Sequence, residues 1–222
     1  MISVVVICHN YGRFLEKCVS SIIKADNKFL KEIIIVDDSS TDNTKIIAKN
    51  LKKKYKKISL YKKKFKSLSK STNYAISKSS GSWIVKVDAD DYVSKNFISD
   101  FVSKIKINNQ TDYICSDIIY FDNKKKIRFK IKQDFVTKSS FFKYPLGSGS
   151  FFKKKLWKSV NGFNENLYYQ DDLDFWLKIK KINKLVYLKK ANYFYRKHGK
   201  NMSKNIILKY ITKIYVLLKN LI

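Results

Sequence analysis

Short apolar runs alternate with segments of helical periodicity over the N-terminal part of the chain. The runs are rich in Val and Ile and nearly free of charge, which is typical of strands in a parallel sheet covered on both faces. The predicted strands are 2–8, 33–36, 58–61 and 83–87, and the predicted helices centre on 14–23, 46–51 and 69–79. This alternation predicts an α/β fold with a mainly parallel, Rossmann-like central sheet, helices on both faces and right-handed crossovers.

The pattern changes after residue 91. Apolar residues at helical spacing predict a helix over 97–105. The runs 112–121 and 126–131 predict a hairpin turned at Asp122 and Asn123. The segment 145–150 combines Pro, Gly and Ser, and we expect it to be a flexible loop.

The last segment, 203–222, carries apolar residues at helical spacing among lysines, which predicts a basic amphipathic helix. Such a helix can pack on the domain or lie on an anionic membrane surface, and we expect packing. The predicted organisation is one domain over 1–202, with halves 1–91 and 92–202, followed by this helix.

Carboxylates gather where two of the predicted strands end. Asp37 and Asp38 follow the second strand, and Asp88, Asp90 and Asp91 follow the fourth. In open α/β sheets this edge binds ligands, and such crowded acids repel one another unless a cation lies among them. Oxygen ligands suit Mg²⁺ or Mn²⁺, and these ions usually bind phosphates as well. The alternative is that these acids only cap helix N-termini, with Thr41 or Asp42 capping the helix after the second strand.

A second acidic centre, Gln170-Asp171-Asp172-Leu173-Asp174, opens another predicted helix. One of these acids is a candidate general base that projects into the same crevice. The alternative is that Asp171 and Asp172 stabilise the helix N-terminus through its dipole. The two histidines, His9 and His198, are each either structural or ligands.

The net charge of +29 comes mostly from lysine, since only three of the 47 basic residues are arginines. We interpret most of the lysines as solvated faces, with attraction to an anionic surface or substrate as the alternative. No nucleic-acid-binding signature accompanies the charge, so no nucleic acid partner is expected. Glycine-rich phosphate loops are also missing, so a bound nucleotide must be held by metal and side chains.

Nothing in the sequence resembles a leader or a membrane span, because the apolar runs are too short. Cys8, Cys18 and Cys115 are scattered and odd in number, which is typical of reduced thiols in a cytoplasmic protein.

Four motifs in order resemble family 2 glycosyltransferases of the GT-A fold. They are Ser3–Asn10, Ile35–Asp42, Asp88-Ala89-Asp90-Asp91, and Gly162-Phe163-Asn164-Glu165 leading to Gln170–Leu177; the tail Tyr195-Arg196-Lys197-His198 resembles a fifth. Together they span roughly residues 2–200. The resemblance implies that 1–91 binds the nucleotide sugar and 92–202 the acceptor.

The resemblance also implies a role for each matching residue in donor binding. His9 and Asn10 lie in the loop that contacts the nucleotide, and Asp38 bonds the base, typically uracil. Asp88, Ala89 and Asp90 form the D-x-D element: Asp90 ligates Mn²⁺ or Mg²⁺, and Asp88 contacts the ribose or the metal with its bound water. His198 completes the metal or diphosphate contacts.

For catalysis, the resemblance makes Asp172 the base that takes the proton of the acceptor hydroxyl, with inversion at the anomeric carbon. Asp171 stands where the family usually has Glu. Another departure is Ser71-Thr72-Asn73, where the family often reads Ala-Arg-Asn. Asn73 keeps its expected donor contact, and Lys66 or Lys70 is the candidate substitute for the missing arginine.

The function implied is transfer from a nucleotide-diphosphate sugar, typically a UDP-sugar, to a glycan acceptor in surface polysaccharide or lipid-linked glycan synthesis. We expect a cytoplasmic enzyme that contacts the inner face of the cell membrane peripherally. Two alternatives remain at this point: a nucleotidyltransferase that makes an activated sugar, and a non-catalytic basic adaptor for membrane or nucleic acid.

Overall fold

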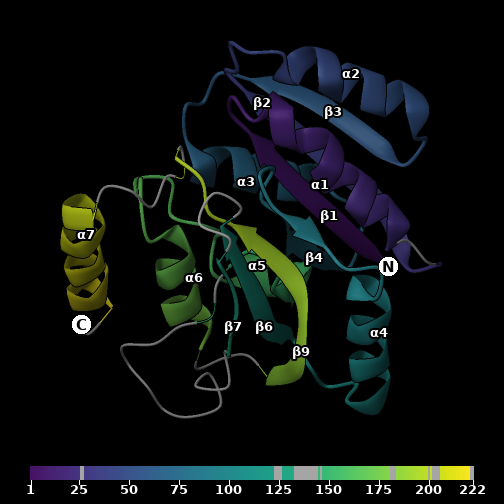
Figure 1. The fold of residues 1–222 in the computed structure, drawn as a ribbon. Helices are drawn as coiled ribbons and strands as arrows, with labels where there is room; N and C mark the ends of the chain where they lie inside the picture. Colours follow the sequence, from purple (N-terminus) through teal and green to yellow (C-terminus); the bar gives the residue numbers. More distant parts are fainter. Residues whose placement is uncertain are drawn as a thin grey trace.

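The computed structural model describes residues 1–25, 28–122, 127–132, 145, 147–180, 184–199, 201 and 206–220. Within these ranges a mixed sheet runs through the molecule, in the order β3-β2-β1-β4-β8-β6-β9-β5, with β7 paired to β6. Helices lie on both of its faces (Figure 1). The predicted fold class is confirmed.

The N-terminal half of the sheet is parallel, as the alternation of strands and helices predicts. Its strands are β1 (Ile2–Cys8), β2 (Leu30–Asp38), β3 (Ile58–Lys63) and β4 (Trp83–Lys86). Strand β1 pairs with both β2 and β4 in parallel, and β2 pairs with β3 in parallel. The helices between these strands are α1 (Gly12–Lys24), α2 (Thr44–Lys54) and α3 (Leu68–Lys78).

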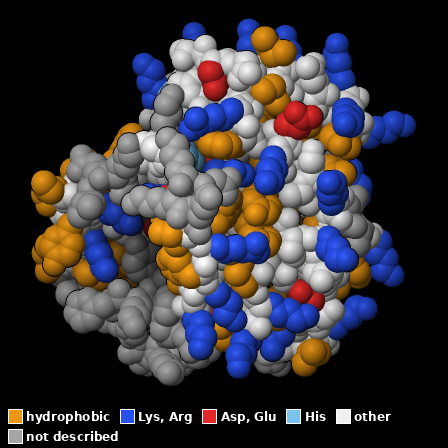
Figure 2. Space-filling view, viewed as in Figure 1, with side chains coloured by type: hydrophobic (Ala, Val, Ile, Leu, Met, Phe, Trp, Pro, Cys, Tyr) orange, Lys and Arg blue, Asp and Glu red, His pale blue; other side chains and the backbone are white. Residues whose placement is uncertain are grey.

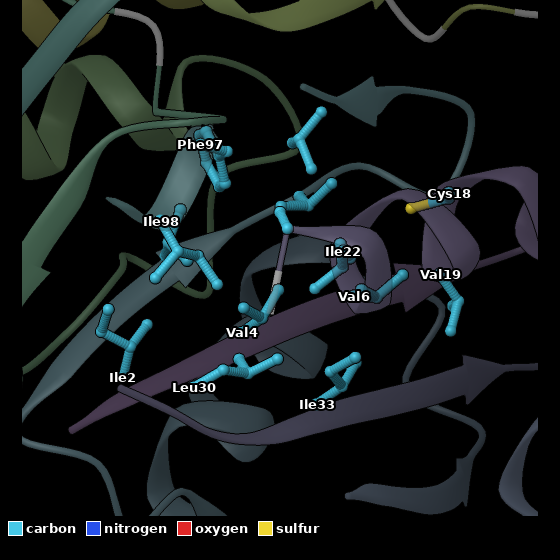
Figure 3. Packing of buried hydrophobic residues seen from close by; sticks show 14 of the residues in the cluster. Ile2, Val4, Val6, Cys18, Val19, Ile22, Leu30, Ile33, Phe97 and Ile98 are labelled. Atoms are coloured by element: carbon cyan, nitrogen blue, oxygen red, sulfur yellow. The ribbon is translucent and has the colours of Figure 1, made fainter. Parts of the chain in front are cut away.

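Alternating residues of the central strands feed two cores. Val4 and Val6 of β1 face α1 and α2, whereas Val5 faces α3 on the other side of the sheet. Figure 3 shows part of the first core, where Val4 and Val6 lie close to Ile22 and Val19 of α1. Because both faces are covered, these strands carry nearly continuous apolar runs.

The second half of the chain completes the sheet with antiparallel and long-range pairings. Its elements are β5 (Tyr92–Val93), α4 (Phe97–Ile107), β6 (Tyr113–Asp122), β7 (Ile127–Ile131), β8 (Phe151–Lys153), α5 (Lys154–Ser159), α6 (Asp171–Ile179) and β9 (Leu185–Arg196). The predicted antiparallel pairing of β6 with β7 is confirmed, although Asn123 lies outside the described residues. Strand β8 joins the halves by pairing antiparallel with both β4 and β6, and β9 pairs in parallel with β6.

The C-terminal helix α7 (Ile206–Lys219) packs against α6. Its Val216 is fully buried in a small cluster with Leu167, Leu173 and Leu177. The predicted packing is therefore present in the described part of this helix. The opposite face stays exposed and apolar, with Ile207, Ile211, Ile214 and Leu218 among its residues.

Lysine and arginine side chains are spread over the visible face instead of gathering in one patch (Figure 2). This distribution favours the interpretation of the high charge as solvated faces. The three cysteines are free and fully buried. Over the described residues, no helix combines the length and apolar character that crossing a bilayer requires.

Candidate active site

The chain leaves β4 through a tight turn, in which the backbone N–H of Asp91 donates to the carbonyl of Asp88 (3.0 Å). The buried carboxylate of Asp91 anchors this turn to β9. It accepts from the Tyr193 hydroxyl (2.6 Å) and from the backbone N–H of Arg196 (2.7 Å). Burial and the charges of Asp88 and Asp90 hold the pKa of Asp91 well above its ordinary value, even though both hydrogen bonds oppose the shift. Strand β9 thus fixes where the neighbouring carboxylates point.

Asp90 faces His198 in this arrangement. The Nε2 atom of His198 lies 2.9 Å from Oδ2 of Asp90, and both side chains are about one-tenth exposed. The imidazole ring is held against Phe14 and Tyr11, with ring centroids 4.8 and 5.9 Å away. Burial, followed by the charge of Asp88, raises the pKa of Asp90, and the hydrogen bond with His198 partly opposes this shift.

Asp88 is held by two groups that the sequence analysis did not assign. The Ser148 hydroxyl donates to its Oδ2 (2.5 Å), and the Lys86 ammonium lies 3.7 Å from its Oδ1. Ser148 belongs to the segment predicted to be a flexible loop. Residues 147–150 form a loop that is tied to the end of β4, because Gly149 N–H donates to the Lys86 carbonyl (2.8 Å) and Ser148 forms an isolated bridge with Lys86.

Asp172 lies in the first turn of α6, and its Oδ1 accepts from the backbone N–H of Leu173 (2.9 Å). Gly147 packs so closely on it that a Cβ at this glycine would lie 2.9 Å from the Asp172 Cβ. Burial, followed by the charge of Asp171, raises the pKa of Asp172 to about 6, while Lys86 pulls the value down. A carboxyl with this pKa is ionised at neutral pH and basic enough to take a proton.

Asp88, Asp90 and Asp172 line one pocket of about 210 Å³. The pocket brings the end of β4 together with the start of α6, and its charged lining residues are Lys86, Asp88, Asp90, Asp171, Asp172 and Lys209. Ala89 and Ser148 line it too. Asp171 is buried, and its Oδ2, which solvent does not reach, has no hydrogen-bond partner among the described residues.

A larger pocket of about 770 Å³ adjoins the first and shares Ile7, Tyr11, Leu68 and Tyr168 with it. Its lining includes His9, Asn10, Asp38 and Lys66, four of the residues expected at the nucleotide. The loops are tied together here, because Asn10 Oδ1 accepts from the backbone N–H of Thr41 (2.7 Å) and His9 Nδ1 lies 2.7 Å from the Asp38 carbonyl oxygen.

Asp38 organises the wall of this second pocket. Its carboxylate accepts from the backbone N–H groups of Lys66 (3.0 Å) and Ser67 (3.1 Å) and from the Ser71 hydroxyl (2.9 Å). Burial tends to raise its pKa, but these hydrogen bonds outweigh burial and the pKa of Asp38 lies below its ordinary value. Asp38 is therefore an ionised group that holds the backbone of 66–67 in place beside the pocket.

Asn73 does not join these residues. Its Oδ1 accepts from Trp157 Nε1 and the Phe163 N–H (3.0 Å each), and its Nδ2 donates to the Phe163 carbonyl (2.9 Å) and to Glu165 (3.0 Å). Asn73 lines a separate surface pocket, together with Lys70. Its amide ties α3 to the 157–165 segment, so the structure leaves it and Lys70 out of the site, whereas Lys66 lies in it.

The site chemistry fits a hard divalent cation. The described part of the chain has no group of three or more His, Cys, Asp or Glu side chains arranged to hold a metal ion. It does bring the Asp90 carboxylate and the His198 imidazole together, and the charge of Asp88 raises the pKa of Asp90, a repulsion that a cation would relieve. Mg²⁺ and similar ions typically take one or two protein ligands and complete their shell with phosphates and water.

Comparison with known proteins identifies the family. The profile of "Glycosyl transferase family 2" matches residues 3–159. The chain belongs to this family. The match covers β1 to α5, including the D-x-D turn, and the family expectation from the sequence is thereby confirmed. Membership favours a glycosyltransferase over both a nucleotidyltransferase and a non-catalytic adaptor.

Curated relatives include a protein named as a glycosyltransferase and one named as a hyaluronan synthase. The family 2 chain is 28% identical over 218 residues to the uncharacterized glycosyltransferase MG060 of Mycoplasma genitalium, covering 91% of this chain and 72% of that protein. It is 24% identical to a hyaluronan synthase of Pasteurella multocida, covering 91% of this chain but only 21% of the synthase.

Solved structures share the fold. S. aureus TarS 1-349 in complex with UDP-GlcNAc superposes with a TM-score of 0.81 at 22% identity, over 97% of this chain and 65% of that one. A mannosyltransferase from Pyrobaculum calidifontis in complex with GDP-Man and Mn²⁺ gives a TM-score of 0.72 at 16% identity, over 96% and 64%. The family 2 chain thus spans about two thirds of these structures.

Sequence reasoning missed three groups that shape the family 2 site, namely Lys86, Ser148 and Tyr193. Lys86 interrupts an otherwise apolar strand next to the acids, and that interruption was the available signal. Ser148 and Tyr193 carry no such signal, because only the long-range pairing of β8 and β9 brings them to the turn.

Proposed function

We propose that this family 2 domain transfers a sugar, with inversion, from a nucleoside diphosphate sugar to an acceptor hydroxyl in a metal-dependent reaction. The observation that carries this proposal is the single pocket in which Asp88 and Asp90 lie opposite the candidate base, Asp172. Donor-binding acids and a base with a pKa of about 6 are the two components that such a transfer needs.

The donor's nucleoside occupies the larger pocket in this proposal, beside His9, Asn10, Asp38 and Lys66. Its diphosphate then extends past Tyr168 into the pocket of the acids, since the two pockets adjoin there. A UDP-sugar is the proposed donor, supported by the UDP-GlcNAc complex of the TarS neighbour. Lys66 supplies a positive charge near the phosphates in place of the arginine of the family pattern.

Asp90 and His198 are the residues that would hold Mn²⁺ or Mg²⁺. The Mn²⁺ complex of the mannosyltransferase neighbour supports this assignment. When bound, the ion supplies positive charge that stabilises the departing diphosphate. Asp88 is already engaged by Ser148 and Lys86, and we assign it to the donor's ribose or to a metal-bound water.

Asp172 acts as general base. The acceptor oxygen attacks the anomeric carbon from the face opposite the diphosphate, the bond from that carbon to the phosphate oxygen breaks, and the acceptor proton passes to the Asp172 carboxylate. Asp171 assists through its negative charge, which raises the pKa of Asp172 and so makes it a stronger base. A base in this role contributes about 10²–10⁴-fold to the rate.

The two halves of the domain divide this work in our proposal. Residues 1–91 bind the donor, whereas 92–202 supply the acceptor side of the pocket, including Tyr169 and Gln170. The proposed acceptor is a growing surface polysaccharide or a lipid-linked glycan. We place the reaction in the cytoplasm, supported by three buried free thiols, and beside the inner membrane face, supported by the exposed apolar residues of α7.

A thermal-shift panel of nucleotide sugars, each with and without Mn²⁺, tests the proposal. We expect one UDP-sugar to raise Tm by several degrees only when Mn²⁺ is present, because ligands that bind the folded state stabilise it. Release of UDP on adding a glycan acceptor then tests transfer. A panel in which no nucleotide sugar shifts Tm, with or without metal, would contradict the proposed function.

A further inference from the structure

Lys86 is the only buried lysine among the described residues. It is the last residue of β4, and its side chain is 8% exposed. Lysine is almost never buried unless its charge is paired, and a strand of this kind normally carries an apolar residue here. The charge of the buried Lys86 must therefore be compensated by neighbouring groups.

The surroundings are acidic. The Lys86 ammonium lies 3.7 Å from Asp88 Oδ1 and lines the pocket shared by Asp88, Asp171 and Asp172. Burial lowers the pKa of Lys86, but Asp88, then Asp171 and Asp172, outweigh burial and raise the pKa above its ordinary value. Lys86 is thus a permanent cation inside the site, beside the carboxylate of Asp88, whose side chain is 31% exposed.

The same charge acts back on the candidate base. Burial and the Asp171 charge favour the protonated form of Asp172, and the Lys86 charge and the backbone N–H groups of Leu173 and Gly147 favour the ionised form. The other charged groups that line the pocket are Asp88 and Asp90 of the turn after β4 and Lys209 of α7. Tyr113 of β6 interacts electrostatically with Asp172. The titratable side chains that complete the lining are those of Tyr11, Tyr168, Tyr169, Tyr193 and Tyr195. Asp90 is already paired with His198.

We propose that Lys86 is a positioning residue of the active site, a fixed internal cation that keeps Asp172 ionised as the base and holds Asp88 toward the donor. This inference rests on the proposed function for its catalytic part, since it assigns how that function's base is maintained. Its electrostatic part depends only on the arrangement of Lys86, Asp88, Asp171 and Asp172.

The experiment compares Lys86→Met, which keeps the length of the side chain and removes the charge, with Lys86→Arg, which keeps the charge. Lys154→Met is the matched control, because the half-buried Lys154 ammonium bonds only the Ser77 and Ser79 carbonyls among the hydrogen bonds described here. The full chain is assayed for kcat/KM with Mn²⁺ between pH 5 and 9.

Loss of the cation should move the acid limb of the kcat/KM profile upward by about 1 pH unit, the effect of removing one nearby opposite charge. With the limb of the unchanged protein near pH 6, Lys86→Met then loses about fourfold at pH 6.5 relative to pH 8.5, which is about threefold more than the unchanged protein loses. Lys86→Arg and Lys154→Met should keep the original limb. A limb that stays in place in Lys86→Met overturns the proposal.

A second readout is independent of transfer. In Lys86→Met the pKa of Asp172, which is already raised in the folded state, rises further because a nearby positive charge is gone. Folded stability then falls more as pH rises through that value. The loss of Tm relative to the unchanged protein should therefore be larger at pH 8 than at pH 5, including the case where the variant is folded only at pH 5.

An equal loss of Tm at both pH values means that Lys86 only fills space, and overturns the proposal. If the unchanged protein transfers no sugar from any donor, the proposed function fails, while the pH dependence of Tm still decides whether Lys86 balances the carboxylates.

Discussion

Asp90 Oδ2 lies 2.9 Å from His198 Nε2, although 108 residues separate them in the chain. Asp90 belongs to the turn after β4, and His198 follows β9 at the far end of the domain. Two potential metal ligands from distant segments therefore meet at one edge of the sheet. A hydrogen bond to each other keeps them together, so that little rearrangement is needed to bind an ion.

His198→Ala should weaken Mn²⁺-dependent binding of the nucleotide sugar about 10–100-fold, by analogy with losing one group of a metal shell. Asp90→Ala should abolish the metal dependence. Isothermal titration with the donor, with Mn²⁺ and with EDTA, measures both effects.

His9→Ala is the matched control, because His9 lines the larger pocket, where we propose that the nucleoside binds. It should weaken binding by the same factor with and without Mn²⁺. Equal donor affinity of the unchanged protein in Mn²⁺ and in EDTA would remove the metal from the proposal.

Asp172→Asn should lower kcat by about 10²–10⁴-fold, because the amide cannot take the acceptor proton. Donor affinity should stay close to that of the unchanged protein. Steady-state kinetics and titration with the donor measure the two quantities. Turnover that persists in this variant would take the base role away from Asp172.

The same variant should be more stable than the unchanged protein at pH 8. The folded-state pKa of Asp172, about 6, lies above that of an unfolded Asp, so stability falls as pH rises through about 6. The amide avoids this loss, which we put at about 1–2 kcal/mol for a partly solvated group, or about 2–8 °C in Tm. At pH 4 the difference should vanish in the same melting experiment.

The kcat/KM profile of the unchanged protein should have an acid limb near pH 6, because Asp172 acts only in its ionised form. Activity should fall about tenfold for each pH unit well below that value. A limb near pH 4 would mean that the base has an ordinary carboxyl pKa and is another residue.

Tyr193→Phe should destabilise the fold by about 1–3 kcal/mol, because the buried Asp91 carboxylate loses a hydrogen-bond donor and Asp88 N–H loses its acceptor. Urea unfolding measures the change. Tyr210→Phe, at an exposed position on α7, is the control and should leave the free energy of unfolding unchanged. Equal stability of both variants would show that the hydroxyl does not anchor the turn.

Local pattern was sufficient for the N-terminal half of the fold. β1, β2 and β4 are mostly apolar runs, because a strand buried on both faces must be apolar wherever it lies in the chain. The edge strand β3 has a shorter apolar run, of which only Ile58 is buried. β8 and β9 could not be predicted, because their local sequences do not show a clear strand pattern. β8 has three residues, and the polar residues of β9, such as Lys189, Lys190 and Asn192, obscure its period.

The site residues likewise include some that the sequence could predict and some that it could not. Asp88, Asp90 and Asp172 could be proposed from the sequence because carboxylates at strand and helix ends are unusual enough to suggest chemistry. The position of the Asn73 side chain could not be predicted from the sequence. An amide can bind a nucleotide, but it can equally well connect α3 to the 157–165 segment by hydrogen bonds, as it does here.

The sequence by itself determined the parallel α/β half, the family, and which side chains could carry the chemistry, because periodicity and acidic motifs are written in neighbouring residues. Only the tertiary structure decided that Tyr193 anchors the turn, that Ser148 and Lys86 hold Asp88, and that Asn73 lies elsewhere. Ser148 and Tyr193 reach Asp88 through contacts between segments about 60 to 105 residues apart. The burial of Lys86 cannot be read from the sequence of its strand alone.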